Sequence, residues 1–133
     1  MKDVVDIEIR VRYAETDQMG VAYYANYLVW FEVGRAEFCR QKGFRYADLE
    51  AVGYRLVVSD VHCRYRGSAK YDEVVIIRTR LKHLNKRMIT FGYEVLREDG
   101  KEAIAEGETQ HICTDSKGKA KSLPEKYLHC LAS

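Results

Sequence analysis

The fold of this chain is decided by residues 13–43, YAETDQMGVAYYANYLVWFEVGRAEFCRQKG. The stretch begins as the end of an alternating strand, passes through a polar loop with Asp17 and Gly20, and continues as the one long helix of the sequence. One side of that helix carries residues at spacings of three and four: Tyr27, Trp30, Phe31, Gly34 and Phe38. The opposite side carries Val29, Val33 and Ala36, and a helix that is apolar nearly all round is typically buried all round. Gly43 predicts a left-handed end to the helix.

Shorter elements precede and follow this helix. Residues 4–13 alternate apolar and charged side chains, as a strand with one solvated face does. After the helix we expect a short helix over 44–52, strands over 54–65, 73–84, 86–98 and 102–114, and a terminal helix over 125–131. Asp99-Gly100, between two alternating runs, indicates a β-hairpin.

Four strands in a row after one helix favour an α+β fold with the helix on one face of an antiparallel sheet. The predicted architecture is a hot-dog fold, a curled antiparallel sheet of about five strands wrapped around one long central helix. We expect residues 1–133 to form a single domain. Because an open sheet edge is usually paired or covered, we also expect a homodimer or homotetramer in which a second copy continues the sheet.

Composition narrows the function classes. The net charge of +2 does not favour nucleic acid as a partner. Four cysteines lie far apart, at Cys39, Cys63, Cys113 and Cys130, and are expected as reduced thiols. The four histidines form no i,i+4 pair, so no metal site is predicted. No apolar run is long enough to span a bilayer and the N-terminus lacks a signal-peptide pattern, which predicts a cytoplasmic protein without membrane insertion.

Asp17 is the candidate catalytic residue. A carboxylate near a helix N-terminus lies close to free backbone N–H groups and to the positive end of the helix dipole. Those N–H groups can polarise a carbonyl oxygen, and the carboxylate can act as a nucleophile or as a general base on water. An aspartate at this place can also be a plain N-cap or a solvated loop residue. Glu15, two residues earlier, is the alternative candidate.

Glu32 and Arg35 are charged residues three apart on the apolar helix. We expect them to form an internal ion pair that satisfies both groups. The alternative is that Glu32 orders a site across a dimer.

Residues 13–28, YAETDQMGVAYYANYL, followed by Phe31, Glu32 and Arg35, resemble the signature of the 4-hydroxybenzoyl-CoA thioesterase family. Within that family the closest likeness is to the small acyl-CoA thioesterases associated with the bacterial Tol-Pal system. The likeness continues through residues 69–72, 91–94, 99–100, 107–111 and 123–125, so it covers nearly the whole chain. The segment from Asp17 to Asn26 is specific, whereas the later segments are weak signals alone.

The resemblance implies a dimer or dimer of dimers that hydrolyses acyl-CoA thioesters to free CoA and a carboxylic acid. It implies no cofactor or metal beyond the coenzyme A of the substrate. Carried over by position, Asp17 is the catalytic carboxylate, and the backbone N–H of Tyr24 polarises the thioester carbonyl. The Tol-Pal-associated branch usually has histidine where this chain has Tyr24, but any residue except proline supplies the backbone N–H.

Cations at turns are the expected partners of the phosphates of coenzyme A. The predicted substrate-binding set is Arg66, Ser68 and Lys70 in one turn and Lys86 and Arg87 in another. Each group can equally be solvated loop charge. Two other functions on the same architecture stay open: a non-catalytic acyl-thioester-binding or regulatory module, which Tyr24 in the histidine position favours, and a dehydratase or hydratase. Such dehydratases use an aspartate–histidine pair, and no histidine lies between Asp17 and Tyr27.

Overall fold

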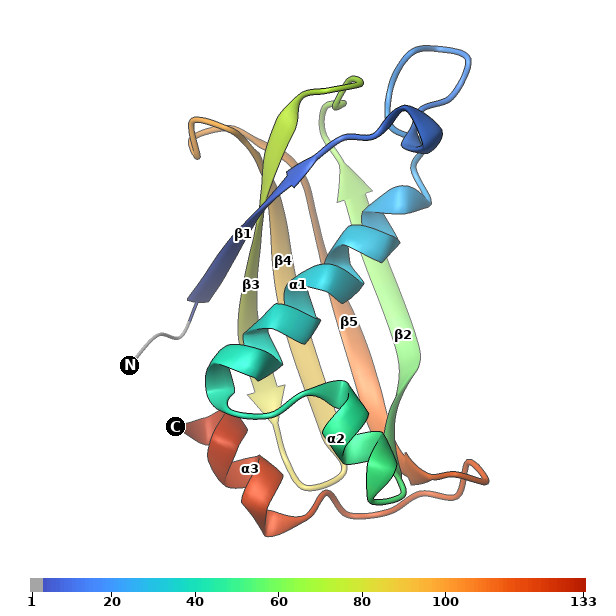
Figure 1. Ribbon diagram of the computed structural model, residues 1–133, viewed down its shortest axis with the longest axis vertical. Coiled ribbons are helices and arrows are strands. Elements are labelled where there is room, and N and C mark those ends of the chain that lie inside the picture. Colours follow the sequence, from blue (N-terminus) through green and yellow to red (C-terminus); the bar gives the residue numbers. More distant parts are fainter. Residues whose placement is uncertain (1–3) are drawn as a thin grey trace.

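A computed structural model describes residues 4–133, which form a five-stranded antiparallel sheet and three α-helices (Figure 1). The elements in chain order are β1 Val4–Arg10, a 3-10 turn Tyr13–Glu15, α1 Asn26–Lys42, α2 Tyr46–Ala51, β2 Tyr54–Tyr65, β3 Val74–Leu84, β4 Met88–Arg97, β5 Ala103–Asp115 and α3 Glu125–Ala132. The strand order is β1-β3-β4-β5-β2, and every neighbouring pair is antiparallel. Helix α1 crosses one face of the sheet, and α2 and α3 lie at one end of it (Figure 1). The predicted α+β hot-dog fold is confirmed.

One face of α1 forms the centre of the core. The predicted inner positions are all buried: Tyr27, Trp30, Phe31, Gly34 and Phe38. Phe31 stacks on the ring of Tyr93 in β4, with the ring centroids 4.2 Å apart. Gly34 allows α1 to approach β3 closely, because a Cβ atom there would lie 2.5 Å from Thr79 Oγ1. The sheet therefore holds the helix through large rings and through one position without a side chain.

The opposite side of α1 is exposed. Leu28 is 38%, Val29 47% and Val33 44% accessible to solvent. The prediction of a helix buried all round was therefore wrong for the single chain. Exposed valines also line β2, which is an edge strand of the sheet: Val57, Val58 and Val61. The single chain thus leaves apolar surface on α1 and along one sheet edge.

Element ends differ from the predicted ones mainly around α1. Strand β1 ends at Arg10, and Tyr13, expected as its last inner residue, lies in the 3-10 turn and is 77% exposed. In α2 only Leu49 is buried, whereas Ala47 and Val52 are exposed. The left-handed end at Gly43 is confirmed, with a φ of 112°. Within residues 4–133 none of the helices has the length and apolar character needed to cross a bilayer.

Candidate active site

The loop between the 3-10 turn and α1, residues 16–25, carries the candidate catalytic groups. A tight turn opens it: the Gly20 N–H donates to the Asp17 carbonyl at 3.0 Å, and Gly20 has a φ of 81°. This left-handed conformation favours glycine. The returning chain then pairs with the segment before it, as the Asp17 N–H donates to the Val21 carbonyl at 2.9 Å. The loop is thus an ordered turn that brings residue 17 back toward the start of α1.

The Asp17 carboxylate is half-buried and only partly engaged. Its Oδ1 accepts the N–H of Met19 at 2.9 Å, the usual bond by which an aspartate closes its own turn. Its Oδ2 accepts no hydrogen bond from residues 4–133. The residue is not the N-cap of α1, because that position belongs to Ala25, whose side chain makes no capping bond. The plain N-cap reading of Asp17 is therefore wrong, and one carboxylate oxygen is available to a ligand.

Tyr24 lies in the turn that leads into α1. Its carbonyl accepts the Tyr65 hydroxyl at 2.8 Å and the Tyr27 N–H at 3.2 Å. Its own N–H donates to no acceptor in residues 4–133, so it is an unpaired donor at the positive end of the helix dipole. The pKa of the neighbouring Tyr23 is raised by the Tyr24 side chain, by desolvation and, to a smaller extent, by the negative charge of Asp17. The Asp17 charge is therefore felt at Tyr23, the residue before Tyr24.

The predicted substrate-binding turn, residues 66–70, lies against this loop. The Ala22 N–H donates to the Ala69 carbonyl at 2.7 Å, and Val21 forms a β-bridge with Lys70. Lys70 and Ser68 are exposed. Arg66 is paired with Glu106, Nη2 to Oε1 2.7 Å, so part of its charge is already neutralised. Lys70 is thus the cation of this turn best placed for a ligand at the loop.

Lys86 and Arg87 do not join this group within one chain. They lie in the β3–β4 turn, at the end of the sheet opposite the 16–25 loop (Figure 1). Strand β3 separates them from Lys70, and its 11 residues span roughly 35 Å at about 3.3 Å per residue. The prediction placed all five substrate-binding residues in one set, and the fold divides them between two ends.

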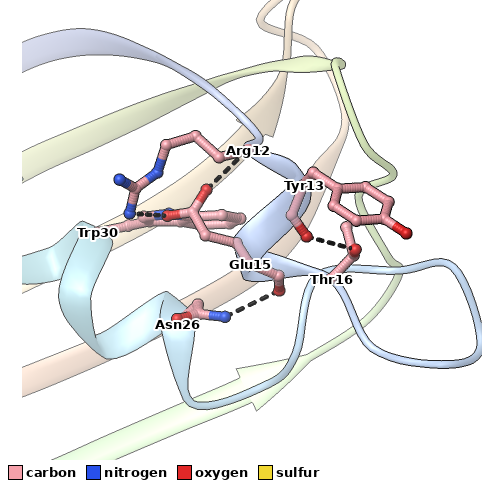
Figure 2. A network of polar contacts seen from close by, with 6 residues as sticks. All are labelled: Arg12, Tyr13, Glu15, Thr16, Asn26 and Trp30. Atoms are coloured by element: carbon pink, nitrogen blue, oxygen red, sulfur yellow. Dashed lines mark hydrogen bonds and ion pairs between the residues drawn. The ribbon is translucent and has the colours of Figure 1, made fainter.

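Glu15, the alternative catalytic candidate, is buried and fully bonded (Figure 2). Its carboxylate accepts the Arg12 N–H at 2.8 Å, the Arg12 guanidinium at 3.3 Å and Trp30 Nε1–H at 3.1 Å. Burial alone would raise the pKa of Glu15, but these donors outweigh it and lower the pKa. A carboxylate so enclosed has no free oxygen for a substrate. The bond from the Arg12 N–H to Glu15 is the acidic half of a capping box. Arginine has no side-chain acceptor for the other half, so the sequence did not carry the usual Ser/Thr-x-x-Glu signal for this role.

The predicted Glu32–Arg35 ion pair is wrong. Glu32 is exposed, whereas Arg35 is buried against the sheet and pairs with no carboxylate in residues 4–133. Beside Arg35, a polar chain runs from the Tyr93 hydroxyl to Thr109 Oγ1 at 2.6 Å and on to His111 Nε2 at 2.8 Å. Burial, with the positive charge of Arg35, lowers the pKa of His111 to about 4, so this histidine is neutral at pH 7.

The described residues contain no group of three or more His, Cys, Asp or Glu side chains arranged to hold a metal ion. All four cysteines are free thiols.

Comparisons with known proteins identify the family and agree with the fold. Residues 11–131 match the family model described as the Thioesterase-like superfamily. A putative acyl-CoA thioesterase of Bacillus subtilis (strain 168), YneP, is 41% identical over 108 residues, which are 81% of this chain and 78% of that protein.

Two solved structures share both fold and sequence. The hypothetical protein TT1821 of Thermus thermophilus superposes with a TM-score of 0.91 and 38% identity, covering 97% of this chain and 95% of that one. The DHNA-CoA thioesterase of Staphylococcus aureus superposes with a TM-score of 0.86 and 37% identity, covering 90% of this chain and 80% of that one.

Proposed function

Because the chain belongs to the Thioesterase-like superfamily, we propose that it hydrolyses acyl-CoA thioesters to free CoA and a carboxylic acid. The observation that carries the proposal is the pairing, on one loop, of a carboxylate oxygen without a hydrogen bond, Asp17 Oδ2, with the unpaired N–H of Tyr24. Relatives named as acyl-CoA thioesterases support the substrate class. The branch associated with the Tol-Pal system and the cytoplasmic location stay predictions.

The two groups have complementary roles in this reaction. The Tyr24 N–H, at the positive end of α1, donates to the thioester carbonyl oxygen and stabilises the negative charge that develops there. Asp17 attacks the carbonyl carbon, or accepts a proton from a water molecule that attacks it. The C–S bond then breaks and the sulfur leaves as CoA; in the nucleophilic route, water next hydrolyses the anhydride between the acyl group and Asp17. In both routes one water molecule supplies the hydroxyl of the carboxylic acid and the proton of the CoA thiol. Apart from water and the substrate, this chemistry uses only groups of the chain, and we expect no metal or further cofactor.

The cations proposed to bind the phosphates of coenzyme A lie at both ends of the sheet. Lys70, with Ser68 and Arg66, lies beside the loop in the same chain. A second copy paired through β2 by a two-fold axis would run antiparallel, so its opposite end would lie beside this loop. Lys86 and Arg87 of that copy would then approach the substrate. We therefore propose a homodimer, or a homotetramer built from it, in which each site takes cations from two chains.

The test is a thiol-release assay across aliphatic and aromatic acyl-CoAs, with Asp17→Asn beside the wild type. Asparagine keeps the size of the side chain and can still accept the Met19 N–H, so the melting temperature should stay near that of the wild type. Loss of the charged oxygen should lower kcat by about 100-fold or more. KM should change little, because the cations and the Tyr24 N–H are intact.

The alternative function is a non-catalytic acyl-thioester-binding or regulatory module. Tyr24 favours it, because the Tol-Pal-associated branch that the sequence resembles usually has histidine there. A wild-type protein that binds acyl-CoA without releasing thiol, or a folded Asp17→Asn protein with full activity, would favour that alternative.

A further inference from the structure

Glu15 is the only aspartate or glutamate among residues 4–133 with a buried side chain, at 5% exposure. The oxygen atoms of Glu15 accept five hydrogen bonds. Three reach the carboxylate from Arg12 and Trp30. Two reach the backbone carbonyl: one from the Tyr23 N–H at 2.8 Å, and one from Asn26 Nδ2 at 2.8 Å, which Figure 2 shows. A buried carboxylate is costly unless its oxygens are bonded, so this arrangement is maintained against a desolvation cost.

The donors come from both sides of the 16–25 loop. Arg12 precedes the loop, Tyr23 lies near its end, and Asn26 and Trp30 belong to the first turns of α1. Glu15 itself is two residues before Asp17, and Tyr23 is the residue before Tyr24. Glu15 thus joins the segment that carries the Asp17 carboxylate to the segment that carries the free Tyr24 N–H.

We propose that Glu15 is a positioning residue for the reaction, which sets the place of the Tyr24 N–H relative to Asp17. Its carboxylate acts through Trp30, and that bond fixes the backbone carbonyl on which Tyr23 and Asn26 are held. The inference rests on the proposed function of those two groups. Hydrolysis requires the attacking oxygen and the oxyanion donor to approach one carbonyl from different directions. A displacement of about 1 Å in such a site can cost about 100-fold in rate.

A matched control exists at the start of α2. There the Arg45 N–H donates to Asp48 Oδ2 at 3.1 Å, and the Arg45 guanidinium bonds Asp48 Oδ1 at 2.8 Å. The local pattern, an arginine followed three residues later by an acid, is the same as at Arg12 and Glu15. Asp48 receives no tryptophan bond and precedes no candidate catalytic loop. Asp48→Asn therefore removes the same motif without touching the site.

The kinetic experiment compares Glu15→Gln with Asp48→Asn in the full chain. Glutamine keeps the shape of Glu15 but turns one acceptor into an NH2 donor that faces Trp30 or Arg12. We expect kcat per folded molecule to fall about tenfold or more with KM within about threefold, and Asp48→Asn to keep both. A purely structural role would lower the melting temperature and leave kcat unchanged. A folded Glu15→Gln protein with a kcat within about twofold of the wild type would overturn the proposal.

Amide hydrogen exchange tests positioning without any activity. Glu15→Gln keeps the carbonyl that accepts the Tyr23 N–H but weakens the carboxylate bonds to Trp30 and Arg12 that hold this carbonyl in place. The Tyr23 and Tyr27 amides should therefore exchange about tenfold faster or more in Glu15→Gln, and in Asp48→Asn they should not. Unchanged exchange in a folded Glu15→Gln protein would contradict the proposal even if the wild type hydrolyses no acyl-CoA. Absence of wild-type hydrolysis alone would count only against the proposed function. If Glu15→Gln does not fold, Trp30→Phe, which removes a single donor, takes its place with the same expected direction.

Discussion

The two sides of helix α1 have nearly the same apolar character and opposite surroundings. Phe31 and Phe38 on one side are fully enclosed, whereas Val29 and Val33 on the other are close to half-exposed. The first side packs on the chain's own sheet, and the second has only solvent in the single chain. Apolar spacing along a helix therefore does not show whether the chain itself covers each side. We expect a second copy to cover the outer side.

The largest expected effect is on the inner side. Phe31→Ala removes a ring that stacks on Tyr93 and should lower the free energy of unfolding by about 3–5 kcal/mol. Val33→Ala on the outer side is the matched variant, and urea unfolding monitored by circular dichroism measures both. If a second copy covers Val33, its effect should grow with protein concentration. If both variants lose the same free energy of unfolding at every protein concentration, the two sides of α1 do not differ in the way described.

The second effect concerns assembly. Val33→Asp places a charge on the outer side of α1, where a partner copy would bury it, and should weaken dimerisation by about 100-fold or more. Sedimentation velocity at micromolar concentration measures the change. Ala132→Asp, at an exposed position of α3, is the control and should leave the dimer intact. A wild-type chain that sediments as a monomer would refute the predicted homodimer or homotetramer.

The smallest effect is on substrate binding. Arg87→Ala should raise KM about threefold to tenfold and leave kcat nearly unchanged, as loss of a phosphate contact does. The KM of the wild type should also rise with salt, because exposed charges are screened beyond about 8 Å at physiological ionic strength.

The Val33→Asp background shows which chain supplies each cation. If Arg87 acts from a second copy, its removal should have no further effect on KM in a monomer. Lys70→Ala should still raise KM there, because Lys70 lies in the same chain as Asp17. An Arg87→Ala effect that persists in the monomer would contradict the two-chain site.

Strand β2 shows which features of the fold could be predicted from the sequence alone. Both its ends, Tyr54 and Tyr65, were predicted to the residue, because Gly53 on one side and the 66–70 turn on the other interrupt a β-branched run. The fold class and the loop position of Asp17 followed from the same kind of pattern. Contacts between residues distant in sequence did not: Trp30 on Glu15, Tyr65 on Tyr24 and the burial of Arg35 depend on how the sheet curls. The i,i+3 spacing of Glu32 and Arg35 could not reveal that one side chain points to solvent and the other to the core.

The bond between Glu15 and Trp30 has a practical consequence, because Trp30 is the only tryptophan of the chain. Intrinsic tryptophan fluorescence therefore reports on the region where the 16–25 loop meets α1, without any added label. Since the pKa of Glu15 is lowered in the folded protein, its carboxylate stabilises the fold above its ordinary pKa. That stabilisation is lost as pH falls through the lowered value. An acid titration followed at the tryptophan emission maximum would record that loss, and the same signal in the presence of an acyl-CoA would report whether a ligand reaches the loop.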